Sequence, residues 1–519
     1  MSRRFVLGLL LLLSLCTIIS IVGSSFPVRE GSLIRVPDDH PTIQEAVNAA
    51  HSGDIILMSA GTYYEHVIVT KTLSLTSDGA NTIIDGDGTG SVVSVMEDNV
   101  YISGFTIQNG ERCGILLQSD SNTILGNIIT TNIFDGIIAN QSSNNRIVQN
   151  KISSNGDGPS GLRWGVGIGL ISSNSNIISN NAISNNVVGG ISLGSSYYNI
   201  VNYNTITNQS AGVTLGHSSG NIVSDNVMIL NGNGIAMHYS TKNTIKHNQI
   251  LKNDIGIGIG YCSVNVIKEN NITENLHGIT MAHGSPDIMI VANIISKNQN
   301  GILIHYSNGS IIHHNNFINN TVNVPEDVYP NVNTWDDGFP SGGNYWSDCA
   351  GADFHSGPYQ NLTYSDGIGD TPHILDVRNE DRFPLMGPIS FFDAGIWNGS
   401  SCDIQVISNS TISNFQLNKT QRIISFNVAG PNYTVGFCRV TIPNIIVQDL
   451  WQNKYTVLVD GIPQTTNNWT DNTYTYIYFT YLHSQHEIVI IPEFPLILIL
   501  PLLMITTVIK KKLINKREK

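Results

Sequence analysis

The chain has 519 residues, of which 41% are hydrophobic and only 13% charged, and its formal net charge is −13 with a pI near 5.5. This acidic balance argues against nucleic acid as a partner, which would require a basic face. Many apolar residues with so few charges are typical of short, buried strands rather than of a helical bundle. The length predicts more than one domain.

The N-terminus predicts secretion. Residues 1–25 read as a signal peptide because Arg3 and Arg4 precede an apolar run, which small residues follow at 23–25. An uncleaved N-terminal anchor is the alternative. Glycosylation sequons fit an extracellular glycoprotein; they begin at Asn140, Asn208, Asn271, Asn308, Asn319, Asn361, Asn398, Asn409, Asn418, Asn432 and Asn468.

The first folded element is predicted to be a short amphipathic helix over residues 41–50, with Ile43, Ala46, Val47 and Ala50 on one face. Strand-like pieces follow at 54–58, 67–69 and 72–75. We expect the helix to close the open end of a stack of strands, where exposed edges invite aggregation.

The centre of the chain is a repeat. Asn recurs at positions 199, 221, 243 and 265, a spacing of 22 residues, and Gly recurs at 212, 234, 256 and 278. Between them lie short apolar-x-apolar pieces with strand periodicity. The pattern predicts an all-β coil of parallel strands over residues 33–322, with about a dozen rungs at the strand spacing of roughly 4.8 Å. The repeated Asn is expected in left-handed turns and in side-chain ladders, and the repeated Gly where a Cβ would obstruct a bend.

After the coil the composition changes. Residues 323–388 are rich in Asp, Gly, Pro and aromatic residues, and we expect them to close the coil. Asp366, Asp370 and Asp376 alternate with glycines as a calcium loop requires, so calcium is a candidate cofactor. The alternative is an acidic turn without metal.

Residues 389–490 carry strand patterns at 423–428, 434–440, 455–459 and 474–481. These predict a β-sandwich that acts as a stalk between coil and membrane. Cys402 and Cys438 lie in this region and are a candidate disulfide outside the cell.

Residues 491–519 form a hydrophobic segment with a basic tail, predicted to anchor the chain in the membrane with the lysines in the cytoplasm. The sequence Pro492-Glu493-Phe494-Pro495 resembles archaeal C-terminal sorting tags, after which the tail is removed and replaced by a lipid anchor. The sequence leaves both possibilities open.

Two stretches resemble a known family. The run "VPDDHPTIQEAVNAAHSGDIILMSAGTYYEHVIVTKTLSLTSDG" is similar to the capped start of the pectin-lyase-like superfamily. The Asn/Gly repeats and the segment "SGGNYWSDCAG…YSDGIGDTPHILD…EDRFPLM" resemble its NosD-like group, also described as carbohydrate-binding and sugar-hydrolysis (CASH) domains. The resemblance covers residues 33–388 and implies a right-handed parallel β-helix built from PbH1 repeats. It also implies an association with copper delivery.

One column of side chains is unusual. Five residues follow the repeat Gly at the same distance on successive rungs, namely His217, Tyr239, Tyr261, His283 and Tyr306. They are candidate substrate-binding residues because aromatic side chains stack on sugar rings. The candidate copper ligands are His283 from this column and the neighbouring His238 and His305. The third interpretation is that these residues cap turns or pack between rungs.

A break in the repeat between Asn145 and Asn176 predicts a loop that carries Arg163 and Trp164, candidate contacts for an acidic glycan. From Asn122 to Asn320 the coil has few carboxylates, and no adjacent Asp pair occurs in this stretch to suggest a hydrolase. The sequence therefore favours a non-catalytic surface protein that binds polysaccharide or builds a surface layer, with other surface proteins as further partners. A polysaccharide lyase or glycoside hydrolase is the first alternative, and extracytoplasmic copper handling is the second.

Overall fold

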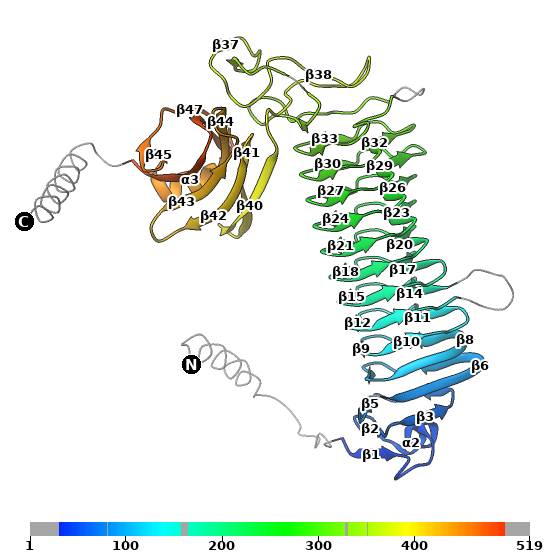
Figure 1. Ribbon diagram of the computed structural model, residues 1–519. Helices are drawn as coiled ribbons and strands as arrows, with labels where there is room; N and C mark the ends of the chain where they lie inside the picture. The colour runs from blue at the N-terminus through cyan, green and yellow to red at the C-terminus, as the bar shows by residue number, and fades with distance from the viewer. Residues whose placement is uncertain (1–30, 80, 157–164, 327–330, 350, 494–519) are drawn as a thin grey trace, which may run out of the picture.

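The computed structural model describes residues 31–79, 81–156, 165–326, 331–349 and 351–493. Figure 1 shows a long coil of parallel strands, with a second body of antiparallel strands beside its C-terminal end. The predicted all-β class, with a right-handed coil followed by a sandwich, is confirmed. The signal peptide and most of the anchor, residues 494–519, lie outside the described residues, and no helix within the described ranges is long and apolar enough to span a bilayer.

The first face of the coil is a parallel sheet of 13 strands. Its strands are β1 (Leu33–Val36), β2 (Ile55–Met58), β5 (Ser74–Ser77), β7 (Tyr101–Ser103), β9 (Thr123–Leu125), β12 (Arg146–Val148), β15 (Ile177–Ser179), β18 (Ile200–Asn202), β21 (Ile222–Ser224), β24 (Thr244–Lys246), β27 (Val266–Lys268), β30 (Met289–Val291) and β33 (Ile311–His313).

In most rungs, a short turn connects the strand of the first face to the strand of the second face. Its strands are β3 (Gly61–Tyr64), β10 (Ile128–Thr130), β13 (Lys151–Ser153), β16 (Ala182–Ser184), β19 (Thr205–Thr207), β22 (Val227–Ile229), β25 (Gln249–Leu251), β28 (Asn271–Thr273), β31 (Ile294–Ser296), β34 (Asn316–Ile318) and β35 (Tyr345–Trp346). Two long strands, β6 (Thr82–Val95) and β8 (Thr106–Leu117), pair with strands of both the second and the third face.

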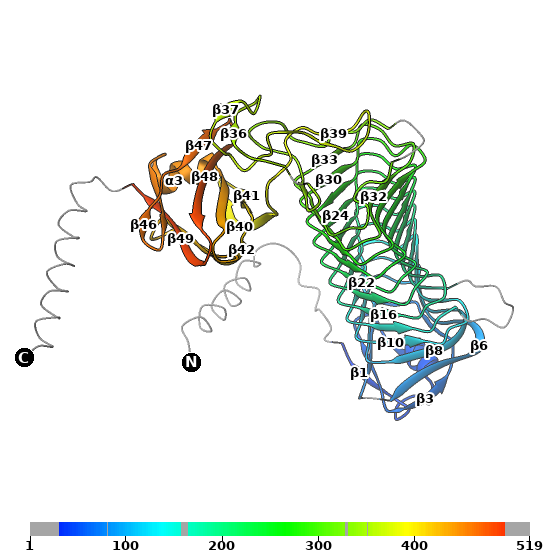
Figure 2. The same cartoon turned by 45° about the horizontal axis from the view of Figure 1, so that its top comes forward.

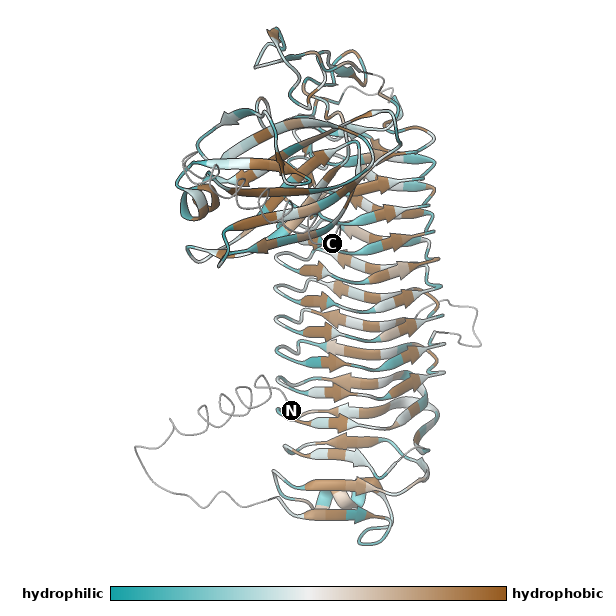
Figure 3. Cartoon of the chain, turned by 60° about the vertical axis from the view of Figure 1, so that its left-hand side comes forward, coloured by the Kyte–Doolittle hydropathy of each residue, from teal (hydrophilic) through white to brown (hydrophobic). Residues whose placement is uncertain are grey.

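The third face completes the rung. Its strands are β4 (Val67–Val69), β11 (Asp135–Asn140), β14 (Val166–Ile171), β17 (Gly189–Gly194), β20 (Ala211–Gly216), β23 (Asn233–His238), β26 (Ile255–Gly260), β29 (His277–Ala282) and β32 (Asn300–Ile304). The core runs along the inside of the coil, where most strands of the first two faces bury one Ile, Val, Leu or Met and most strands of the third face bury two. Figure 3 shows this as an apolar colour that recurs at the same place in successive strands.

Buried asparagines form ladders inside the turns. Asn221 Nδ2 donates to Asn243 Oδ1 at 3.1 Å, and Asn243 Nδ2 donates to Asn265 Oδ1 at 3.1 Å. The predicted ladders are therefore confirmed, but the expectation that these asparagines adopt left-handed backbone is wrong. The residue before each one does so instead, as Lys242 (φ 56°) precedes Asn243. The Asn side chain points inward because it must satisfy the backbone groups of the buried turn.

The repeated glycine is required where rungs touch. A Cβ on Gly234 would lie 2.6 Å from the carbonyl oxygen of Gly256 on the next rung and 2.6 Å from Ile250 Cγ2. Because neither the backbone nor the packed isoleucine can withdraw, only glycine fits at this position.

Both ends of the coil are covered. Helix α2 (Ile43–Ala49) begins at the N-cap Thr42 and buries Ile43, Ala46 and Val47 against the first rung. At the other end, Phe317 of β34 stacks on Trp346 of β35 with ring centroids 4.2 Å apart. Residues after β35 carry two short hairpins, one of β36 (His355–Ser356) with β37 (Leu362–Thr363), the other of β38 (His373–Ile374) with β39 (Glu380–Asp381).

The second body is a sandwich of two five-stranded sheets and one helix. One sheet contains β40 (Ile389–Trp397), β41 (Ser400–Ser408), β44 (Val435–Pro443), β48 (Tyr474–Leu482) and β47 (Asn467–Thr470). The other contains β42 (Thr411–Asn418), β43 (Ile423–Ala429), β49 (Gln485–Pro492), β45 (Tyr455–Val459) and β46 (Ile462–Pro463). The helix, which the sequence analysis missed, is α3 (Asn444–Trp451).

The sandwich lies against the side of the coil in both Figure 1 and Figure 2. Asn316 of the coil exchanges two hydrogen bonds of 2.8 Å with the backbone of Ile389. The proposed disulfide in the sandwich is wrong. Cys402 and Cys438 are free, because Cys438 of β44 is in register with Ser408, six residues along β41 from Cys402.

Candidate functional site

The His/Tyr column forms a stacked ladder on the surface of the coil. The ring centroids of His217 and Tyr239 are 4.9 Å apart, those of Tyr239 and Tyr261 are 4.7 Å apart, and those of Tyr261 and His283 are 5.0 Å apart. The planes of neighbouring rings differ by 5°, 5° and 11°. We refer to these four residues as the ring ladder.

The backbone explains why these side chains point outward. Each ladder residue follows a third-face strand and adopts left-handed backbone, with φ between 51° and 57°. The next residue turns inward, as Ser240 does, where its hydroxyl donates to Leu215 O at 3.1 Å. Tyr239 and Tyr261 are therefore half exposed, at 52% and 50%. Tyr306 holds the same position one rung beyond His283 and makes an edge contact with His305 at 4.6 Å.

The stacking changes how a sugar could contact the ladder. Each inner ring has another ring against both faces, so a sugar cannot stack on Tyr239 or Tyr261 as the sequence analysis expected. What the two inner rings present to solvent is their edges with the phenolic hydroxyls, and His217 and His283 add imidazole nitrogens at the two ends of the ladder. These groups donate and accept hydrogen bonds at an interval of about one strand spacing.

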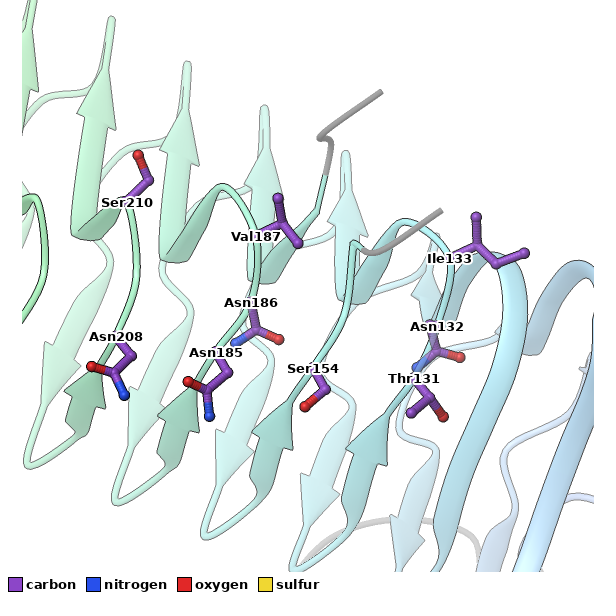
Figure 4. Close-up of a pocket in the computed structure, with 9 residues that line it drawn as sticks. All are labelled: Thr131, Asn132, Ile133, Ser154, Asn185, Asn186, Val187, Asn208 and Ser210. Carbon is purple, nitrogen blue, oxygen red and sulfur yellow. The ribbon is translucent and has the colours of Figure 1, made fainter. Parts of the chain in front are cut away.

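The loop candidates Arg163 and Trp164 lie outside the described residues. On the strands that flank this loop, and on the neighbouring rungs, the structure contains a cavity of about 620 Å³. Figure 4 shows its walls, which are turns of the coil lined by neutral side chains: Thr131, Asn132, Ile133, Ser154, Asn185, Asn186, Val187, Asn208 and Ser210. Amides and hydroxyls without charge are suited to hydrogen bonding with neutral polar ligands.

The calcium candidates are not brought together. Asp366 accepts the backbone N–H of Ile368 at 2.9 Å, and Asp370 accepts backbone N–H groups of Phe354 and His355 at 3.0 Å. Asp376 accepts the N–H groups of Arg378 and Asn379. Each carboxylate thus accepts from a different set of backbone N–H groups. Within the described ranges no three His, Cys, Asp or Glu side chains are arranged to hold a metal ion, so calcium stays a prediction.

The copper candidates are only partly brought together. A Cβ on Gly260 would lie 3.1 Å from His238 Nδ1 and 3.8 Å from His283 Cδ2, so these two imidazoles flank the same glycine. His305 lies on the rung beyond His283. The soft sulfur ligands that copper favours, Met237, Met281 and Cys262, are buried inside the coil. The described residues therefore do not fit a three-histidine copper centre with sulfur ligands.

A second site, missed by sequence reasoning, lies where the sandwich meets the coil. This groove has a volume of about 990 Å³, and we call it the junction groove. The coil contributes Lys246, His247, Lys268, Glu269 and Asn271, and the sandwich contributes Phe391, Phe392, Asp393, Asp403 and Ile412.

The junction groove contains a compact charge network. His247 Nε2 lies 2.7 Å from Glu269 Oε2, and Lys268 Nζ lies 3.1 Å from Glu269 Oε1. Across the groove, partial removal from water raises the pKa of Asp403, and the nearby charges of Glu269 and Asp393 add to the rise. The groove therefore combines carboxylates in different environments with an apolar wall, but no signal along the sequence could bring residues 247–269 beside residues 391–403.

Comparisons with known proteins agree with the geometry. Residues 165–351 match the family described as "Periplasmic copper-binding protein (NosD)", and residues 90–237 match "Right handed beta helix region". The coil of this chain is thus similar to the NosD-like right-handed β-helix proteins. The family resemblance predicted from the sequence is confirmed, and the matched residues of this NosD-like chain include the whole ring ladder.

One curated relative is the "Cell surface glycoprotein" of Methanothermus fervidus, which is 30% identical over 134 residues. The match covers 25% of the NosD-like chain and 22% of that relative, so it spans only about a quarter of this chain and less of the relative.

Two solved structures are similar to this chain at low sequence identity. A DFA-IIIase from Arthrobacter chlorophenolicus A6 in complex with DFA-III is 12% identical, with a TM-score of 0.46 over 58% of this chain and 98% of that one. A family 28 exopolygalacturonase from Yersinia enterocolitica is 11% identical, with a TM-score of 0.44 over 59% and 78%. Similarities this low support no conclusion about what the NosD-like chain binds.

Proposed function

We propose that this chain is a cell-surface β-helix protein that binds polysaccharide on its coil without cleaving it. The observation that carries the proposal is the exposed ring ladder, which repeats the same polar edge on consecutive rungs. A polymer with a regular repeat meets the same groups again along such a surface. The name of the curated relative supports a position at the cell surface. In this proposal the signal peptide directs the chain out of the cell, and the C-terminal anchor holds it at the membrane.

The electrostatics of the chain are compatible with a glycan ligand. The ladder offers phenolic hydroxyls and imidazole nitrogens and contains no carboxylate or ammonium group, so it can bind sugar hydroxyls without burying a carboxylate or ammonium charge. Its side chains are also pre-ordered, because each inner ring is held between two others. Less rotamer entropy is therefore lost when a ligand binds.

The test is a glycan array with the full chain, compared with a Tyr239→Ala, Tyr261→Ala double variant. We expect the wild type to bind one class of polysaccharide and to release no shortened products. The double variant should bind about tenfold or more weakly, since two aromatic hot-spot residues are lost. Equal binding by both proteins would show that the ladder is not the site.

Glycoside hydrolysis is the second candidate function, because the junction groove contains two carboxylates in different environments. Hydrolysis of a glycosidic bond needs one protonated and one ionised carboxyl group. The raised pKa of Asp403 suits it to donate a proton to the leaving oxygen. Glu269, held by His247 and Lys268, suits activation of water.

This second candidate is tested by incubating the array ligand with wild type, Glu269→Gln and Asp403→Asn proteins. Shortened products from the wild type that disappear with either variant would establish hydrolysis and replace the non-catalytic proposal. Products that persist in both variants would exclude the junction groove as their source.

A further inference from the structure

The ring ladder has an open end at His217. One rung earlier the same position is occupied by Ser195, because Gly194 pairs with Gly216 and Ser195 N donates to Gly216 O at 2.9 Å. Ser195 and His217 share the same left-handed backbone, with φ 51° in both. Ser195 therefore stands where a further ladder ring would stand but has only a hydroxymethyl group. Within the described ranges the ring contact of His217 is with Tyr239, on its other face.

The surface beside this open end is flat on one side. Gly194 and Gly216 precede the two positions and have no side chain, and a Cβ on Gly216 would meet nothing closer than Leu193 O at 4.0 Å. One rung later the equivalent of Gly216 is His238, which covers the flank of the ladder there. A ligand ring therefore has access at His217 that it lacks beside Tyr239.

The other side of the open end is aromatic. Tyr197 and Tyr198 follow Ser195 on the same turn and are 39% and 72% exposed. The ring of Tyr198 lies against the backbone of Gly220 on the next rung, where a Cβ would be only 2.7 Å from its Cε1 atom. The tyrosine ring is thus held against the coil while most of its surface remains in contact with solvent.

We propose that a single pyranose ring at a glycan end stacks on the open face of His217, above Ser195, as the next member of the ladder. The proposal rests on the polysaccharide function above and names where a sugar face is bound. The C–H face of a sugar and an aromatic ring attract each other at the ring separation that the ladder already has. Because the inner faces are covered and Tyr306 occupies the column position beyond His283, the ladder takes one such sugar per chain. We expect this sugar to be a terminal one, since a polymer cannot continue along the axis of the stack.

The test places one side chain at three positions with the same left-handed backbone. Ser195→Tyr fills the proposed site, Ser172→Tyr adds a ring one rung further along the same column, and Lys297→Tyr adds a ring at a different corner of the coil. All three native residues are exposed, with φ of 51°, 50° and 54°. The probe is a set of short neutral and uronic-acid oligosaccharides, each with a free and a chemically blocked end, titrated calorimetrically into the full chain.

We expect Ser195→Tyr to weaken binding about tenfold or more, because the new ring takes the place of the sugar. Ser172→Tyr should tighten binding by enclosing the sugar between two rings, and Lys297→Tyr should leave it unchanged. The wild type should bind one oligosaccharide per chain, and blocking one of its ends should abolish binding. Thermal unfolding of each variant checks that it folds.

Other outcomes separate this proposal from the function on which it rests. If the wild type binds and Ser195→Tyr binds equally well, the stacking site is wrong while polysaccharide binding stands. If the wild type binds none of the ligands, both fall. If Ser195→Tyr does not fold, the binding of His217→Leu and His217→Tyr tests the stacking site instead. The first removes the aromatic face and should weaken binding, whereas the second keeps the face and should retain it, and equal binding by both would overturn the proposal.

Discussion

Asp381 accepts the indole N–H of Trp346 at 2.8 Å, directly beyond the last rung of the coil. The same carboxylate oxygen accepts the backbone N–H of Asn344 at 2.7 Å, and its other oxygen accepts that of Phe383 at 3.2 Å. Asp381 is fully buried. One side chain thus satisfies three donors at the point where the coil ends and would otherwise expose an edge.

Replacement of Asp381 by Ala should therefore destabilise the C-terminal end of the coil by about 3 kcal/mol or more, since buried donors are left without acceptors. Asp381→Asn retains one carbonyl oxygen and should cost less. Hydrogen exchange resolved along the chain is the measurement, because a repeat structure can open locally. Equal protection of β33 and β34 in the wild type and Asp381→Ala would contradict the prediction.

His314 should make stability depend on pH. It is buried beneath the closing segment, and burial lowers its pKa to about 4, to which the neighbouring His313 contributes. An unfolded histidine titrates near 6.5, so between about pH 6.5 and 4 the unfolded chain binds more protons than the folded one. Acidification through this range should therefore lower the free energy of unfolding by about 3 kcal/mol through His314 alone.

The measurement is the difference in unfolding between wild type and His314→Asn at pH 7 and at pH 4. Asn tolerates the left-handed backbone at this position, where φ is 55°. The comparison is needed because burial raises the pKa of Asp381 to about 7, which contributes a pH dependence of opposite sign. A difference that does not change with pH would disprove the role of His314.

The central Asn ladder should be sensitive to single substitutions. Asn243 Oδ1 accepts the backbone N–H and the side-chain amide of Asn221, and Asn243 Nδ2 donates to Ser218 O at 2.9 Å. Asn243→Ala should cost about 3 kcal/mol, because it leaves these buried groups unpaired. The exposed neighbour provides the control, since Lys242→Asn keeps the turn and should change stability by less than about 0.5 kcal/mol. Chemical denaturation of the two variants compares them directly.

Arg439 should hold the sandwich to the closing segment. This buried side chain of β44 donates to the carbonyl oxygen of Asp366 at 2.5 Å and also to that of Pro340, and it lies over the Tyr476 ring at 5.0 Å. Arg439→Ala removes the contact and should free the sandwich from the coil, which small-angle scattering would detect as a larger radius of gyration. Arg439→Met keeps most of the packing volume but not the hydrogen bonds. If both variants keep the wild-type radius, other contacts such as Asn316 with Ile389 suffice.

The coil was predictable because its residues repeat. Each Asn and Gly of the repeat meets its own copy on the next rung, so spacing along the chain is also spacing in space. The ladder from His217 to His283 could be found in this way. That the inner rings are closed to a stacking sugar could not be predicted, because the sequence does not show that the ring planes are parallel and cover one another.

The junction groove could not be predicted. His247 and Asp403 come from parts of the chain that are joined only by the docking of the sandwich on the coil, and no periodicity records that contact. The left-handed backbone was also assigned to the wrong residue. Lys242, whose side chain has no special preference for it, adopts the strained conformation so that Asn243 can point inward.

The Asn ladders also give the coil a direction. In each described step of the ladder from Asn127 to Asn344, one side-chain N–H donates to the C-terminal rung and the side-chain oxygen accepts from the N-terminal rung. The side-chain carbonyl groups therefore all point the same way along the coil, and their dipoles add as peptide dipoles do in a helix. The last amide of the row, Asn344, lies 3.5 Å from the carboxylate of Asp381, so the two ends of this row of amides are electrically different.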